Sequence, residues 1–312
     1  MKKILCLVFS LAMTMAHAET EKNCSPSKWG PEDEIGSANL VTPERVVAAA
    51  RLIKKGKSVP LGIVIDSETP AYPPRGLTLQ VVSPGQAGGK ELFDYGGIYN
   101  DDLAHLWFGI GSQLDGLGHL GENGHYYNCN SAAEISQVTG LTRLGVHNVP
   151  PLVGRGVLID IARHRGVTHL EAGDAISAEE IRAAAAAQGV KFQEGDVILL
   201  HTGWTDAKFN SDPVAWGSSE PGIDNDAARY LAGLNPLAVG ADTWGLGPVP
   251  YKSGDKEAYE HVILLKHNGI YILETMNTGL LVAEGVQEFM FVLGQARIRG
   301  TVQMVINPVA MW

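Results

Sequence analysis

The stretch that decides the fold reads Gly109-Ile-Gly-Ser-Gln-Leu-Asp-Gly-Leu-Gly-His119. It places an amide, a carboxylate and an imidazole at Gln113, Asp115 and His119, among four glycines. Gln113 and Asp115 are two residues apart, so on an extended segment their side chains point to the same face. Imidazole and carboxylate groups suit zinc, whereas a carboxylate with an amide oxygen suits manganese or magnesium. The stretch is therefore a candidate metal site, and the alternative is a polar turn whose Asp and His satisfy backbone groups.

A second cluster lies downstream, where His261 and Glu274 flank an apolar run that is interrupted by a turn at residues 268–269. We interpret the cluster as a helix end, a turn and a buried strand. A carboxylate that closes an apolar strand is costly to bury without a partner. It needs a cation, a hydrogen-bond network or water. The alternative is a histidine at a helix start and an edge glutamate that pairs with a local Arg or Lys.

Together the two clusters resemble the cyclase-like family of metal-dependent hydrolases, which includes bacterial kynurenine formamidase, isatin hydrolase and trans-dienelactone hydrolase. The family signature is His-x-Gly-Thr-His-x-Asp-x-Pro-x-His, followed far downstream by a His, an apolar run and a Glu. Gly109 and Gln113 stand at the first two His positions, whereas Asp115 and His119 are kept. Because two histidines are replaced, we expect a single-metal or Gln-ligated site in place of the two-metal site of the formamidase-type members.

The resemblance extends beyond the signature. His261 and Glu274 match the downstream pair, with one extra residue between them. Residues 154–160, 195–204 and 239–244 also look like the family, so the similarity runs from about residue 28 to the C-terminus. It implies a strand-rich α/β fold of the swivelling β/β/α type, in one domain spanning residues 19–312.

The resemblance also suggests roles for the site residues. We expect Gln113 and Asp115 to hold a divalent ion, manganese or zinc, with His261 and Glu274 completing or bordering the site. His119 is the expected general base and proton shuttle, since its neutral form is available near neutral pH. The expected activity is hydrolysis of a small cyclic amide, a lactone or a formamide by metal-activated water. The alternative is a periplasmic small-molecule binding protein or an inactive scaffold that has lost its metal.

Four further residues are candidates for the wall of a substrate pocket: Phe108, His201, Trp204 and Trp244. His201 follows a buried strand and precedes Thr-Gly, from where it could reach a carboxylate or an oxyanion. A hydrogen-bonded histidine at a strand end is the commoner arrangement. Likewise, the two tryptophans are more often core residues than pocket residues.

The first 18 residues have the pattern of a secretory signal peptide. A short basic start precedes an apolar run and an Ala-His-Ala end at residue 18. The run is too short for a membrane-spanning helix. We therefore expect cleavage after Ala18 and a periplasmic or secreted protein; an internal N-terminal helix is the alternative.

Charge and cysteine content narrow the class of protein further. Cleavage removes Lys2 and Lys3 and no acid, which lowers the formal net charge from −10 to −12. An acidic chain without basic runs argues against nucleic acid and anionic membranes as partners. We expect a small-molecule substrate, and we also expect a homodimer. Cleavage also removes Cys6 and leaves Cys24 and Cys129. These two can pair in an oxidising compartment, and two free thiols are the alternative.

Capping and turn residues predict the order of the elements. Thr-Pro-Glu at residues 42–44 and Ser-Ala-Glu-Glu at residues 177–180 start helices. The expected helices are 43–55, 177–189, 226–232 and 259–265. The expected buried strands, short apolar and β-branched runs between turn residues, are 157–161, 197–200, 238–240, 270–273, 289–292 and 302–306. Residues 58–120 are rich in Gly and Pro and are expected to form strands and long loops.

Overall fold

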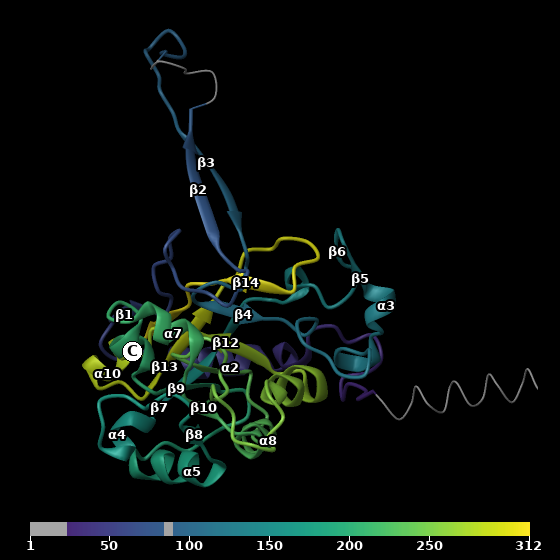
Figure 1. The fold of residues 1–312 in the computed structure, drawn as a ribbon, viewed down its shortest axis with the longest axis vertical. Helices are drawn as coiled ribbons and strands as arrows, with labels where there is room; N and C mark the ends of the chain where they lie inside the picture. The colour runs from purple at the N-terminus through teal and green to yellow at the C-terminus, as the bar shows by residue number, and fades with distance from the viewer. Residues whose placement is uncertain (1–23, 84–89) are drawn as a thin grey trace, which may run out of the picture.

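The computed structural model describes residues 24–83 and 90–312 and is shown in Figure 1. The signal peptide predicted for residues 1–18 lies outside the described residues. One curled nine-stranded sheet organises a strand-rich α/β domain, as predicted. Among the described residues, no helix is both long and apolar enough to cross a membrane.

The central sheet is mixed. Its four middle strands, β7, β9, β11 and β12, are parallel, and the strands beyond them on both sides run antiparallel to their neighbours. In spatial order the strands are β1 (Ser58–Pro60), β15 (Val309–Met311), β13 (Glu288–Leu293), β7 (Leu152–Asp160), β9 (Val197–His201), β11 (Ala238–Ala241), β12 (Tyr271–Glu274), β4 (Gln113–Asp115) and β14 (Gln303–Val305).

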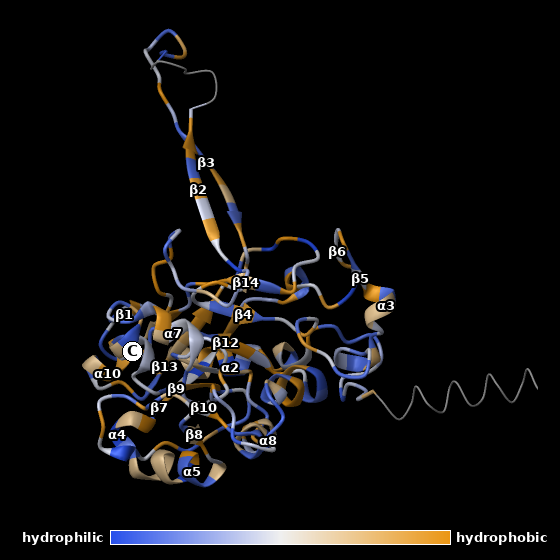
Figure 2. Ribbon diagram, viewed as in Figure 1, coloured by the Kyte–Doolittle hydropathy of each residue, from blue (hydrophilic) through white to orange (hydrophobic). Residues whose placement is uncertain are grey.

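The core lies on this sheet. All residues of β9, β11 and β12 are buried, as expected for strands that are covered on both faces and that therefore read as continuous apolar runs. Figure 2 shows the labelled strands β9 and β12 predominantly in the hydrophobic colour. Each of the six predicted strands is present. The bounds differ by one residue at most, except that β7 begins at Leu152 and not at residue 157.

The α-helices pack against this sheet or lie at its periphery. They are α2 (Pro43–Ala50), α3 (Ala132–Ile135), α4 (Ile161–Arg165), α5 (Ala178–Ala187), α6 (Trp204–Lys208), α7 (Pro213–Ser218), α8 (Asn225–Gly233), α9 (Tyr259–His261) and α10 (Gly279–Glu284). A π-helical segment, η4 (Val262–His267), continues α9 directly, and short 3-10 helices lie at η1 (Gly36–Leu40), η2 (Tyr127–Cys129) and η3 (Val146–Asn148).

The predicted caps form. The Thr42 hydroxyl accepts a hydrogen bond from the Arg45 N–H at 3.3 Å, and the Ser177 hydroxyl accepts one from the Glu180 N–H at 3.2 Å. The prediction that the first helix runs to residue 55 is wrong, because α2 ends at Ala50. The chain leaves the helix there, and the Lys55 N–H donates to the carbonyl of Trp312 at the C-terminus, 3.1 Å away.

The remaining strands form three small sheets: β2 (Leu77–Val82) with β3 (Asp101–Leu106), β5 (Ser136–Gln137) with β6 (Gly140–Leu141), and β8 (Ala175–Ile176) with β10 (Gly222–Ile223). The β2–β3 pair forms an arm that projects from the body of the protein (Figure 1). Leu79, Val81 and Leu103 on the arm are 61%, 64% and 47% exposed.

Cys24 and Cys129 form a disulfide, so the structure decides between the two arrangements that the sequence left open. The bond ties the N-terminal segment to η2, just after the glycine-rich motif. There the Ser27 N–H donates to the Asn128 side-chain oxygen at 2.8 Å, which adds a polar contact to the same junction.

We expect the double variant Cys24→Ser, Cys129→Ser to lose about 4 kcal/mol of unfolding free energy. The bridge closes a sequence separation of 105 residues, and a loop of that order constrains the unfolded chain by roughly this amount in the entropy model. Urea unfolding of both proteins under non-reducing conditions measures the difference. Identical midpoints and slopes, or two free thiols per unreduced wild-type chain, would contradict the prediction.

Candidate metal centre

Three neighbouring strands bring polar side chains to one face of the sheet. β4 lies between β12 and β14, with Gln113 opposite Glu274 and Asp115 opposite Gln303. Because side chains alternate along a strand, Gln113 and Asp115 share a face, as their spacing predicts. The Gln113 side-chain nitrogen lies 3.2 Å from Asp115 Oδ1, which confirms that the two side chains meet.

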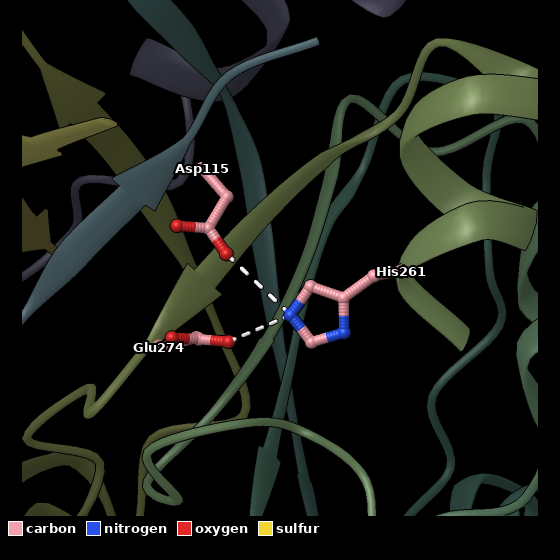
Figure 3. A group of neighbouring side chains, drawn as sticks. All are labelled: Asp115, His261 and Glu274. Atoms are coloured by element: carbon pink, nitrogen blue, oxygen red, sulfur yellow. Dashed lines mark hydrogen bonds and ion pairs between the residues drawn. The ribbon is translucent and has the colours of Figure 1, made fainter. Parts of the chain in front are cut away.

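His261 completes the group from the opposite side, at the point where α9 passes into η4 (Figure 3). Its Nε2 lies 3.0 Å from Glu274 Oε1 and 3.6 Å from Asp115 Oδ2. One potential ligand atom from each of the three residues lies within 4.8 Å of the others. All three side chains are buried, with Asp115 fully so.

This group fits a divalent metal ion. Asp115 Oδ2 is buried and has no hydrogen-bond partner among the described residues, although a bare carboxylate oxygen is costly to bury. Two carboxylates and one imidazole supply the oxygen and nitrogen donors that zinc and manganese accept. Asp115, His261 and Glu274 would hold the ion, and the unpartnered oxygen faces the position where the donors converge.

The charges of the group favour metal binding. Burial raises the pKa of Asp115, but His119, His261 and the hydrogen bond from Gln303 outweigh it and bring the pKa down to about 2. Burial, together with the charge on Asp115, raises the pKa of Glu274 to about 8. Burial lowers the pKa of His261, but the neighbouring carboxylates of Asp115, Glu260 and Glu274 raise it well above its usual range. A cation would replace the protons that this cluster otherwise retains.

Gln113 faces the carboxylates with its amide nitrogen. This nitrogen donates to Glu274 Oε2 and to Asp115 Oδ1, and the Gln303 side chain also donates to Asp115 Oδ1 at 2.7 Å. In this arrangement Gln113 is a hydrogen-bond donor that orients two ligands, whereas the sequence suggested that its oxygen binds the metal. A ligand role would require the amide to rotate by half a turn.

His119 lies beside the group. Its Nε2 is 4.0 Å from Asp115 Oδ2, and its ring meets the His261 ring edge-on, with centroids 6.3 Å apart. Burial lowers the pKa of His119, Asp115 raises it, and His261 and Arg75 lower it, so that the pKa falls below its ordinary value. The imidazole is therefore neutral at neutral pH, as a general base must be.

Glu260 supports His261 from behind. Its Oε1 lies 3.0 Å from His261 Nδ1 and accepts a hydrogen bond from the Tyr251 hydroxyl at 2.9 Å. Glu260 is fully buried. A carboxylate on the far nitrogen of a metal-binding histidine fixes the orientation and tautomer of the ring, and here it directs Nε2 toward Asp115 and Glu274.

We expect Glu260→Gln to weaken metal binding about 10- to 100-fold, the usual effect of removing such a carboxylate. The exposed neighbour Glu257, at the rim of the cavity described next, supplies a matched control as Glu257→Gln. Equilibrium titration with Mn²⁺ against a chelating indicator measures both. Equal affinities for the two variants would show that Glu260 does not act through His261.

The group opens onto a cavity of about 560 Å³. His119, His261 and Glu274 line it together with Tyr72, Arg75, Leu120, Glu220, Trp244, Gly245, Val249, Pro250, Tyr251, Glu257 and Ala258. The Trp244 and Tyr72 rings are 6.0 Å apart and tilted by 30°, which gives the cavity an aromatic wall. Trp244, one of the four candidate wall residues, therefore lines the cavity.

Arg75 takes space that Gly109 leaves free. A Cβ on Gly109 would lie 2.6 Å from Arg75 Nη1, which donates to the Gly109 carbonyl at 2.9 Å. The family signature has a histidine at this position. With glycine at position 109, the Arg75 guanidinium group fits at the edge of the cavity. This position of Arg75 was not predicted from the sequence.

The other three predicted wall residues lie elsewhere. His201, at the end of β9, is buried, with Nδ1 2.8 Å from the Thr278 hydroxyl. Trp204 is buried at the start of α6 and donates from Nε1 to the Trp216 carbonyl at 3.5 Å. Phe108 packs against the core. None of these three described residues lines the cavity. Hydrogen bonds hold His201 and Trp204 elsewhere, and Phe108 packs against the core.

The sequence missed Gln303, Glu220 and Glu260. Gln303 reaches Asp115 only through the β14–β4 register, and Glu220 lies in a loop far from either motif. Glu260 was the easiest of the three to predict from the sequence, since it directly precedes His261. A carboxylate next to a candidate metal-binding histidine is a usable sign of such support.

Comparison with known proteins identifies the family. A family model described as putative cyclase matches residues 59–248. A solved structure described as a novel cyclase is 31% identical, covers 93% of this chain and 100% of its own, and superimposes with a TM-score of 0.83. The chain therefore belongs to the putative cyclase family. No curated protein matches it.

More distant solved structures share the fold. An isatin hydrolase bound to the product analogue thioisatinate is 16% identical, with a TM-score of 0.61 over 86% of this chain and 98% of its own. Isatin hydrolase A from Labrenzia aggregata, bound to benzyl benzoate, is 17% identical, with a TM-score of 0.60 over 86% of this chain and 97% of its own.

Proposed function

We propose that this protein is a metal-dependent hydrolase. The observation that carries the proposal is the buried group of Asp115, His261 and Glu274, in which Asp115 Oδ2 accepts no hydrogen bond from a described residue, beside the 560 Å³ cavity. Family membership and the fold shared with structures named as hydrolases support it.

The residues of the site have separate roles in the proposed reaction. A divalent ion at such a site lowers the pKa of a bound water and polarises a carbonyl group. Asp115 and Glu274 are fixed for this role by Gln113 and Gln303. The neutral imidazole of His119 takes the proton from the attacking water and returns it to the leaving group.

The proposed substrate is a small cyclic amide, a lactone or a formamide. A cavity of about 560 Å³ lies within the range of volumes that is typical of small-molecule sites. Tyr72 and Trp244 provide an aromatic wall on which a planar ring can stack. Arg75 places a positive charge near the carboxylate that ring opening or loss of formate generates.

Metal analysis and a hydrolysis screen test the proposal together. Purified protein is analysed for bound metal, treated with chelator and reloaded with Mn²⁺ or Zn²⁺. Each form is then assayed on N-formyl anilines, isatins and unsaturated lactones. We expect hydrolysis that chelation abolishes and reloading restores. No bound metal and no metal-dependent hydrolysis would favour the alternative, a binding protein of the same fold.

We further propose that the protein is exported and works as a homodimer. The signal-like N-terminus and the Cys24–Cys129 disulfide support a periplasmic or secreted location. The exposed apolar residues of the β2–β3 arm support a second copy as partner, since a two-stranded hairpin alone is marginally stable in water. Cell fractionation and light scattering of the purified protein test the two points.

A further inference from the structure

Glu220 is a buried carboxyl group at the cavity that the proposed chemistry does not use. It is fully buried, and its backbone pairs with Val249 through two hydrogen bonds of 3.0 and 2.8 Å. Its Oε2 accepts hydrogen bonds from the backbone N–H groups of Trp244 at 2.6 Å and Gly245 at 3.2 Å. One half of the carboxyl is therefore engaged, and the side chain is held in one orientation.

The other oxygen, Oε1, has no hydrogen-bond partner among the residues that the structure describes. Glu220, Trp244 and Gly245 line the same cavity as His261 and Glu274. Gly245 keeps the space beside Oε1 free, since a Cβ there would lie 2.9 Å from that atom. Leaving a buried polar oxygen unpaired is costly, and a ligand in the cavity can supply the missing partner.

We propose that Glu220 is a substrate-binding residue, whose Oε1 forms a hydrogen bond with an acceptor oxygen that the substrate carries in addition to the carbonyl under attack. The proposal rests on the hydrolase function proposed above, and it narrows the substrate class. A cyclic imide or a similar two-carbonyl ring fits such a cavity better than a lactam with a single carbonyl.

The surroundings of Glu220 favour its neutral form, because a fully buried carboxylate is costly to ionise without a cation, and Glu220 forms no ion pair with any described residue. Burial, followed by the charge on Glu274, raises the pKa of Glu220 well above its usual range, and the charge on Glu260 adds to this. The two backbone N–H groups on Oε2 oppose the shift without overcoming it. The neutral carboxyl carries an O–H group, and this group needs an acceptor.

A pair of rings that differ by one carbonyl tests the proposal: phthalimide and isoindolin-1-one. Dissociation constants for both are measured with wild type, Glu220→Gln and Glu220→Met, on the full chain loaded with Mn²⁺ and again after chelation. The ratio of the two constants cancels any general loosening of the cavity. Glu179→Met, an exposed glutamate on α5, is the control.

We expect wild type to favour phthalimide, and Glu220→Met to reduce that preference about three- to tenfold, the effect of one neutral hydrogen bond. Glu220→Gln should keep it within about twofold, because its amide oxygen can accept from Trp244 and Gly245 while its N–H group donates into the cavity. Gly245→Ala crowds Oε1 and leaves Glu220 in place, so this variant should also reduce the preference for phthalimide.

An unchanged ratio in both Glu220→Met and Gly245→Ala overturns the proposal. An equal loss of the preference in Glu220→Gln and Glu220→Met also overturns the proposal. Such a result would mean that Glu220 supports the cavity structurally and does not form a hydrogen bond with the ligand. The dissociation constants can be measured whether or not the protein hydrolyses the ligands. A chain that binds no metal but shows the expected ratios would therefore remove the hydrolase function and leave the role of Glu220 in ligand binding intact.

Discussion

Asp115→Asn is expected to abolish metal binding and turnover together while the fold remains intact. Asp115 Oδ2 accepts no hydrogen bond from a described residue, and His261 and His119 lie 3.6 and 4.0 Å from it. The substitution keeps the shape of the side chain and removes its charge, so the remaining donors are one carboxylate and one imidazole. Metal content after equilibration with Mn²⁺ or Zn²⁺, together with hydrolysis rates, measures the loss.

A matched control separates this effect from the cost of altering any buried aspartate. Asp196 is also buried, where it forms an ion pair with Arg155 at 2.8 Å. Asp196→Asn should lower the free energy of unfolding and leave metal content unchanged. If Asp115→Asn retained stoichiometric metal, the assignment of Asp115 as the essential ligand would be wrong.

Local sequence rules sufficed for much of the fold and marked the members of the metal group as polar candidates, whereas their assignment to one site came from the resemblance to the family. Alternation along a strand placed Gln113 and Asp115 on one face, and the cost of burying Glu274 without a partner marked it as part of a polar site. Continuous apolar runs gave the buried strands correctly, and caps such as Thr42 and Ser177 gave the helix starts. All these features depend on neighbours within a few residues.

The features that the sequence did not reveal depend on pairing between distant segments. The insertion of β4 between β12 and β14 brings Gln303 to Asp115, and no local pattern specifies that register. The side-chain nitrogen of Gln113 faces two carboxylates only because Glu274 lies directly opposite it. Similarly, His201 and Trp204 have the composition of pocket residues, but their hydrogen bonds to Thr278 and Trp216 keep them away from the cavity.

His119→Ala decides whether this residue transfers protons or binds the metal. As a base, it should be needed for turnover but not for metal affinity, and its loss should reduce turnover about 10²–10⁴-fold. The distance of 4.0 Å between its Nε2 and Asp115 Oδ2 is compatible with both roles. Its lowered pKa and its position in the lining of the cavity support the first role.

The pH dependence adds a second measurement with a definite sign. A base acts in its neutral form, so activity must fall as pH drops through the pKa of His119. Because burial lowers that pKa, we expect the acidic limb of the wild-type profile below the ordinary histidine value of about 6.5, and we expect His119→Ala to lack this limb. Metal titration of the same variant completes the test. A large loss of metal affinity, with activity that returns at high added metal, would show that His119 is a ligand.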